Sequence, residues 1–239
     1  LLPKGLKIRL EGKQVSSSYL QMTLAMMAYF GVGYTFRDNE IIIDHQLYTS
    51  RDFLVESDWS SAGYLFAIAA LSPNARIRAR YFFEDSLQGD SAVQQLMRPF
   101  GVLSKIEGDE LILEQKGDRE RYIKHDFISQ PDLYQTMAVV AAALNIELEA
   151  SGLQTLEIKE TDRLFALSQE LNKIGVGINK VAHQQDDINY HLKGKCKIEI
   201  PEFEDYGDHR MVMSLACLAT ISPVIINNPG VVSKSYPDF

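Results

Sequence analysis

The chain has 239 residues, of which 46% are hydrophobic and 23% charged, a composition typical of a globular protein with one large or two small domains. Its formal net charge is -8 and it has no long run of basic residues, which argues against a nucleic-acid-binding surface. No stretch reaches the roughly 18 apolar residues of a membrane span, so we expect neither nucleic acid nor a membrane as a partner.

The first fifty residues predict a strand, a helix and a hairpin. Residues 6–10 alternate in polarity as a strand does, and the apolar run 19–30 predicts a helix that Gly31 ends. Two further strands, joined by a short loop, are expected at residues 33–36 and 40–44.

Residues 52–113 predict a longer unit with the order strand, helix, strand, helix, strand, strand. Its elements are a strand at 53–55, a helix at 62–71 after Asp58, a strand at 75–80, a helix that follows the segment 86–90 and runs to Phe100, and a hairpin that turns at Gly108. Trp59, next to Asp58, is expected to pack in the core.

The same unit recurs at residues 122–193, with Asp132 in the place of Asp58. Asp90 and Asp162 are 72 positions apart, close to the 74 positions between Gly101 and Gly175. A third, shorter copy has a strand at 197–200, a helix after Asp208, a strand at 224–226 and a final segment at 234–238. The repetition predicts an α/β fold whose units bury apolar helix faces against one another.

Charged clusters precede three of the apolar runs. Lys159-Glu160-Thr161-Asp162-Arg163 opens one predicted helix, Asp208-His209-Arg210 opens another, and Asp132 precedes a third. Taken singly, these acids are explained as helix N-caps with solvated charges. Because helix N-termini bind anions, and equivalent helices of repeated units start on one side, we expect the clusters to converge on a locally positive, anion-binding face.

These segments resemble, in order and spacing, the signature segments of the 5-enolpyruvylshikimate-3-phosphate synthase family. The segments that carry the resemblance are 159–164, 208–211 and 234–239, with support from 15–19, 56–61, 86–90 and 131–132. The resemblance implies the enolpyruvyl-transferase architecture, an inside-out α/β barrel of two domains that close over shikimate 3-phosphate and phosphoenolpyruvate. Residues 1–50 resemble the last unit of the first domain, and residues 51–239 resemble the second domain with its last unit truncated.

The activity that the resemblance implies is transfer of the enolpyruvyl group of phosphoenolpyruvate to the 5-hydroxyl of shikimate 3-phosphate, with release of phosphate, in chorismate and aromatic amino acid biosynthesis. It implies Asp132 as the base near the hydroxyl and Glu160 as the residue that handles protons at the methylene carbon. Which of the two protonates the methylene stays open.

The resemblance also implies the groups that hold the substrates. Phosphoenolpyruvate would be bound by Arg163, Arg210 and Lys234, since guanidinium and ammonium groups bind carboxylate and phosphate. Shikimate 3-phosphate would be bound by a second set: Ser16, Tyr19, Asp132, Thr155 and Lys159. His209 is expected to hydrogen-bond behind these residues. No cofactor and no metal are expected, because no partner His or Cys stands at ligand spacing from His209.

Two departures from the family pattern concern substrate contacts. Glu157 stands where the family usually carries a basic residue, and Thr155 stands where some members place asparagine. The alternatives are therefore a sister transferase that acts on UDP-N-acetylglucosamine, and a non-catalytic relative that serves as a binding module.

Several expectations concern the chain as a whole. Cys196 and Cys217 form neither a disulfide framework nor a zinc-site pattern, so a reducing, cytoplasmic setting is expected. Leu1 stands in place of an initiator methionine, and the family's N-terminal basic residues and Ser-Ser-Gln segment have no counterpart. We expect the chain to be a C-terminal portion that folds alone as a monomer but carries half an active site and does not turn over substrate.

Overall fold

The computed structural model describes residues 2–12, 14–182 and 188–239. The helices are α1 (Ser17–Tyr29), α2 (Trp59–Leu71), α3 (Val93–Leu96), α4 (Tyr134–Leu144), α5 (Arg163–Asn172) and α6 (His209–Ala216). Short 3₁₀ turns are η1 (Gly89–Ala92), η2 (Pro131–Leu133), η3 (Gln154–Ile158), η4 (Cys217–Thr220) and η5 (Pro229–Lys234). None of the helices in the described ranges has the length and hydropathy needed to cross a membrane.

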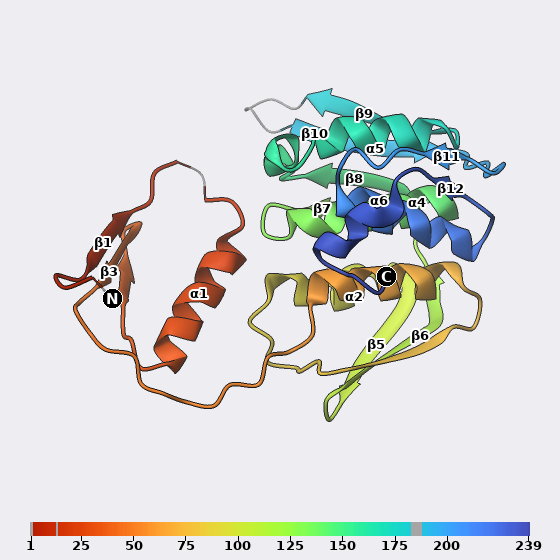
Figure 1. Cartoon of the computed structure of the whole chain (residues 1–239). Helices are drawn as coiled ribbons and strands as arrows, with labels where there is room; N and C mark the ends of the chain where they lie inside the picture. The colour runs from red at the N-terminus through yellow and green to blue at the C-terminus, as the bar shows by residue number, and fades with distance from the viewer. Residues whose placement is uncertain (1, 13, 183–187) are drawn as a thin grey trace.

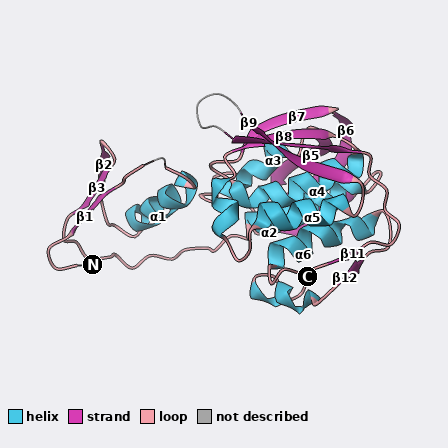
Figure 2. Cartoon of the chain, turned by 90° about the horizontal axis from the view of Figure 1, so that it is seen from above, coloured by secondary structure: helices cyan, strands magenta, loops and turns pink. Residues whose placement is uncertain are grey.

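The strands form four separate sheets (Figures 1 and 2). The strands are β1 (Leu6–Arg9), β2 (Thr35–Arg37), β3 (Glu40–Ile43), β4 (Arg76–Arg80), β5 (Phe100–Glu107), β6 (Glu110–Arg119), β7 (Tyr122–Asp126), β8 (Glu147–Ser151), β9 (Val176–Ala182), β10 (Ile188–Gly194), β11 (Glu202–Phe203) and β12 (Ile225–Ile226).

The unit predicted at 122–193 is confirmed in full. Strands β7 and β8 are parallel and are joined across α4, while the β9–β10 hairpin adds β10 beside β8, so the sheet order is β7-β8-β10-β9. The first unit has the order β4-β6-β5, which matches β8-β10-β9. The predicted repetition of one α/β unit is therefore confirmed.

The strand predicted at 53–55 is wrong, and the first unit lacks its edge strand. Phe53 packs instead against Tyr29 and Phe30, with ring centroids 5.4 and 6.2 Å away, while Leu54 and Val55 stay exposed. Ser57 alone reaches the end of β4 within the described residues 52–57: its amide donates to the carbonyl of Tyr81 at 2.7 Å and its hydroxyl to the carbonyl of Arg80 at 2.9 Å. Aromatic packing on α1 thus competes with strand pairing for this segment.

Two other predicted elements differ. The helix expected to run to Phe100 is reduced to η1 and the single turn of α3, because Pro99 cannot continue a helix. The strand expected at 197–200 is wrong: Ile200 has a φ of +47°, which breaks the extended run before Pro201. The third unit starts instead at β11, which pairs in parallel with β12.

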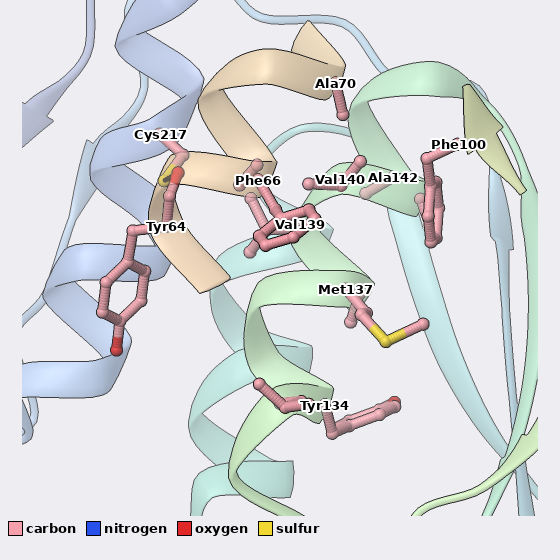
Figure 3. Packing of buried hydrophobic residues seen from close by; sticks show 14 of the residues in the cluster. Tyr64, Phe66, Ala70, Phe100, Tyr134, Met137, Val139, Val140, Ala142 and Cys217 are labelled. Carbon is pink, nitrogen blue, oxygen red and sulfur yellow. Dashed lines mark hydrogen bonds between the residues drawn. The ribbon is translucent and has the colours of Figure 1, made fainter. Parts of the chain in front are cut away.

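Helices α2, α4 and α6, one from each unit, contact one another at the centre of the molecule. Buried residues make up ten of the 13 in α2, nine of the 11 in α4 and six of the eight in α6. Helices that are buried on most sides must be enclosed on most sides, so the sheets lie around them. Figure 3 shows Phe66 of α2 packed with Val139 and Val140 of α4 in this core, and Trp59 is also fully buried, as predicted.

The N-terminal residues form a smaller assembly with a hydrophobic cluster of their own. Strands β1, β3 and β2 form an antiparallel sheet, and α1 lies beside it, set to one side of the remaining units in Figure 1. The cluster contains the buried side chains of Leu24, Val32, Ile41 and Ile43. The segment 44–58 then leads to α2.

Gly152 gives a first testable prediction, because it follows β8 directly and packs against the loop at Asp126 and Ile128. It has a φ of +72°, and a Cβ there would lie 2.1 Å from Asp126 Oδ1 and 2.3 Å from the Ile128 nitrogen. Gly152→Ala is expected to lower the free energy of unfolding by about 3 kcal/mol or more, from left-handed strain and steric overlap.

Gly108→Ala is the matched control, since Gly108 has a φ of +67° but open space around its Cβ position. The strain alone predicts a loss of about 1–2 kcal/mol. Urea unfolding of both variants measures the difference, and equal losses would contradict the steric account.

Candidate active site

The buried guanidinium of Arg163, at the start of α5, joins three carboxylates. Only 2% of its side chain is exposed. Its Nη1 donates to Asp132 Oδ1 at 2.9 Å, its Nη2 to Glu160 Oε2 at 2.7 Å, and its Nε to Asp208 Oδ2 at 2.6 Å. The starts of α4, α5 and α6 are therefore brought together, as the shared placement of the charged clusters predicted.

Capping explains how these helix starts differ. Asp58, Asp162 and Asp208 accept hydrogen bonds from backbone N–H groups in the first turns of α2, α5 and α6. Asp132 lies within η2 and is not an N-cap, so its carboxylate is available to side chains. The sequence repeat makes Asp132 equivalent to Asp58, but their carboxylates have different partners.

Three more cations surround the carboxylates on the solvent side. Lys159 Nζ lies 3.3 Å from Asp132 Oδ1, and Arg210 Nη2 lies 3.3 Å from Asp132 Oδ2. Lys234 Nζ donates to Glu160 Oε1, and its side chain is 53% exposed. With Arg163 there are four cations against the three carboxylates, so the expected positive face has an excess of only one charge in this network.

The electrostatics keep both outer carboxylates ionised. Burial raises the pKa of Asp132, but the charges of Arg210, Lys159 and Arg163 together leave it below its ordinary value. The hydrogen bond from Lys234 is the main reason that the pKa of Glu160 falls to about 2. At neutral pH both carboxylates are therefore ionised, so each can accept a proton and neither carries one to donate.

Tyr19, in α1, is close enough to the network for Asp132 and Arg210 to influence the pKa of its hydroxyl. Burial, followed by the charges of Asp90 and Asp132, raises the pKa of its hydroxyl, which therefore stays protonated. Ser16 stands at the N-cap position of α1 with a φ of 53°, but its side chain caps no backbone N–H. The Ser16 hydroxyl is therefore not used to cap α1, although its backbone nitrogen donates to the carbonyl of Ile128 at 3.0 Å.

Three residues singled out by the sequence lie outside the ion-pair network. Thr155 has a buried hydroxyl with no hydrogen-bond partner among the described residues. Glu157 accepts a hydrogen bond from the Tyr190 hydroxyl of β10 at 3.2 Å. His209 is 6% exposed, and within the described ranges its Nδ1 has no partner, so this atom does not make the hydrogen bond that we expected of His209. Burial lowers the pKa of His209.

Sequence reasoning assigned no site role to Asp208, Asp90 or Ser60. Asp208 is fully buried and bonds Arg163, a role that its place in the Asp-His-Arg cluster could have indicated. Asp90 is 3% exposed and accepts a hydrogen bond from the Ser60 hydroxyl. Over the part of the chain that the structure describes, no three His, Cys, Asp or Glu residues are grouped to hold a metal ion.

Comparison with known proteins gives consistent matches over the whole chain. The family model for EPSP synthase (3-phosphoshikimate 1-carboxyvinyltransferase) matches residues 1–239. The 3-phosphoshikimate 1-carboxyvinyltransferase of Bacteroides fragilis strain YCH46 is 39% identical over 244 residues, which cover 100% of this chain and 58% of that protein. The protein of the same name from Clostridium novyi strain NT is 32% identical, with 98% and 52% covered.

Solved structures share the fold. An EPSP synthase from Acinetobacter baumannii superposes with a TM-score of 0.68 at 21% identity and covers 98% of this chain and 55% of its own. The enolpyruvyl transferase NikO from Streptomyces tendae superposes with a TM-score of 0.64 at 15% identity, with 98% and 53% covered. The chain therefore spans about half the length of the proteins that it matches.

The buried network predicts a large effect of removing Arg163. Arg163→Met would leave the buried Asp208 carboxylate without its guanidinium partner and Asp132 with only Arg210 and Lys159, and breaking a buried ion pair costs about 3–5 kcal/mol. Arg78→Met is the control, because Arg78 is 54% exposed and its Nη1 lies 3.4 Å from Glu110 Oε2. An exposed pair contributes about 1 kcal/mol or less. Chemical denaturation measures the loss of unfolding free energy in each variant. Similar losses for the two variants would contradict the central role of Arg163 in the network.

The low pKa of Glu160 predicts a pH dependence of stability. Its value of about 2, against an ordinary 4.5, stabilises the folded state fully above pH 4.5. This contribution is lost as the pH falls from 4.5 toward 2. The difference in unfolding free energy between the unmodified chain and Glu160→Gln should therefore shrink over that range. Glu120→Gln, at an exposed position, is the control, and a constant difference for Glu160→Gln would contradict the assignment.

Proposed function

Because this chain belongs to the EPSP synthase family of 3-phosphoshikimate 1-carboxyvinyltransferases, we propose that the Arg163 network is part of an active site for enolpyruvyl transfer. The reaction joins the enolpyruvyl group of phosphoenolpyruvate to the 5-hydroxyl of shikimate 3-phosphate and releases phosphate. The observation that carries the proposal is the contact of the buried Arg163 guanidinium with Glu160 of its own segment, with Asp132, 31 residues before it, and with Asp208, 45 residues after it.

Asp132 is the proposed base. The 5-hydroxyl must lose a proton as its oxygen bonds to the central carbon of phosphoenolpyruvate, and the methylene carbon gains one. An ionised carboxylate suits the first of these transfers, and the cations around Asp132 keep its pKa below the ordinary value. The same cations hold its two oxygens from both sides, so the carboxylate has a fixed orientation.

Glu160 is proposed to handle protons at the methylene carbon in a way that depends on Lys234. In the absence of substrate the ammonium group holds the pKa of Glu160 at about 2. If Lys234 turns to the phosphate of phosphoenolpyruvate, Glu160 loses the largest influence that lowers its pKa, and the pKa rises while Arg163 remains as the nearby cation that lowers it. Binding of phosphoenolpyruvate would then move Glu160 toward the protonated form that the reaction requires.

The remaining cations have different access to a substrate. Arg210 and Lys234 border the solvent side and are proposed to bind the carboxylate and phosphate of phosphoenolpyruvate. Arg163 is proposed to join them after one of its carboxylate partners releases it, because its nitrogens already contact three carboxylates. In this proposal shikimate 3-phosphate is held by Lys159, Tyr19, Ser16 and Thr155.

The domain organisation is part of the proposal. Residues 1–50 would complete one domain and residues 51–239 would form most of a second, a division supported by the separate hydrophobic clusters of the two parts. Glu157 was the main reason to consider a non-catalytic relative. Its hydrogen bond to Tyr190 directs it away from the ion-pair network, so it gives that alternative no support.

A chimera tests the activity, since the chain spans about half the length of its relatives. The chain replaces the matching segment of the Bacteroides fragilis protein, and phosphate release is measured with both substrates. Asp132→Asn should lower kcat by about 10²–10⁴, the usual contribution of a general base, with little change in phosphoenolpyruvate binding. Asp118→Asn, at an exposed position of β6, should leave kcat unchanged. Full activity of the Asp132→Asn chimera would refute the proposed base.

A further inference from the structure

The turn at Gly89 and Asp90 (the 89–90 turn) contains a buried carboxylate that the proposed chemistry does not use. Asp90 is 3% exposed, and its Oδ2 accepts a hydrogen bond from the Ser60 hydroxyl. Its Oδ1 is buried without a hydrogen-bond partner among the described residues. Because burying a polar group without a partner is unfavourable, this placement calls for a compensating role.

Gly89 lies close to α1. A Cβ at Gly89 would lie 2.4 Å from both Cβ and Oγ of Ser18, in the first turn of α1. Gly89 does not have a left-handed backbone, so its own conformation does not require glycine. The requirement comes from the proximity of α1.

The same turn of α1 is held on a second side by the loop before Asp132. The Ser16 nitrogen donates to the carbonyl of Ile128 at 3.0 Å, and the Ser18 hydroxyl donates to the carbonyl of Ser129 at 2.9 Å. These bonds alone leave the helix free to tilt about the loop. Contact with the 89–90 turn fixes the remaining side.

Tyr19 follows Ser18 and is directed by this arrangement. Its side chain lines a cavity of about 1320 Å³ together with Ser60 and Asp90. After burial, the charge of Asp90 has the largest effect on the pKa of the Tyr19 hydroxyl, followed by the charges of Asp132 and Arg210. Tyr19 therefore shares a cavity with the 89–90 turn, and its hydroxyl is in the electrostatic field of Asp132 and Arg210.

We propose that the 89–90 turn is a positioning element that seats the first turn of α1 and so directs the Tyr19 hydroxyl toward Asp132 and Arg210. Asp90 and Gly89 act through Tyr19 and touch no reacting atom. The contribution of this seating to catalysis rests on the proposed function, in which Tyr19 contacts shikimate 3-phosphate. The seating itself does not depend on that function.

Hydrogen exchange of the 239-residue chain tests the seating without any ligand. Gly89→Ala should force Ser18 away and raise the exchange of α1 amides about tenfold, while α5 amides keep their rate. Adding Ser18→Gly removes the clashing atoms, so the double variant should exchange like Ser18→Gly alone. Unchanged exchange of α1 in Gly89→Ala, or no recovery in the double variant, would overturn the proposal.

A double-mutant cycle tests the link to Tyr19, with shikimate 3-phosphate binding to the chimera measured by calorimetry. Asp90→Ala should weaken binding about tenfold when Tyr19 is present and less than about twofold in the Tyr19→Phe background. Asp90→Asn keeps an acceptor for Ser60 and should restore most of the affinity. A merely structural role would weaken binding equally in both backgrounds, which would overturn the proposal.

The two hypotheses fail in different ways. If the unsubstituted chimera does not bind shikimate 3-phosphate, the proposed function is wrong, and the exchange measurement still decides whether the 89–90 turn seats α1. If binding is normal and the cycle shows no coupling, the proposed function stands and the positioning role is wrong.

Discussion

The pairing of the Arg163 guanidinium with three carboxylates is the interaction on which the rest of the site depends. A charge with 2% exposure is tolerated only when it is paired and hydrogen-bonded, and here all three guanidinium nitrogens have carboxylate partners. Each carboxylate lies at a different helix start. A single desolvated charge thus fixes where α4, α5 and α6 meet, and the cations Lys159, Arg210 and Lys234 are arranged around carboxylates that it holds.

The core supplies the rigidity that this pairing requires. Helices α2, α4 and α6 are apolar on nearly every side and pack together in the centre, so their starts cannot shift independently. Asp208 connects the helical core to the ion-pair network, since it caps α6 and also binds Arg163. Asp132 is not needed as a cap, and this leaves a carboxylate free for chemistry at an equivalent position of the repeat.

The repeat, the central helices and the meeting of the charged clusters could be predicted, because apolar periodicity and motif spacing are local properties of the chain. The strand at 53–55 could not, since Phe53 packs on Tyr29 and Phe30, far away in the sequence. The burial of Arg163 could not be predicted either, because its sequence motif is the same whether the side chain faces solvent or carboxylates. Asp90 was missed because its importance comes from contacts with Ser60 and α1, which no spacing indicates.

Side-chain NMR of the arginine Nε–H groups tests the central claim most directly. If Arg163 is the buried hub, its Nε–H, bonded to Asp208 at 2.6 Å, should give a signal that persists at neutral pH through slow exchange with water. Arg163→Lys would identify the signal by removing it, and exposed Arg78 gives the reference for fast exchange. An Arg163 signal that exchanges as fast as that of Arg78 would show that the guanidinium is open to solvent and would contradict the account.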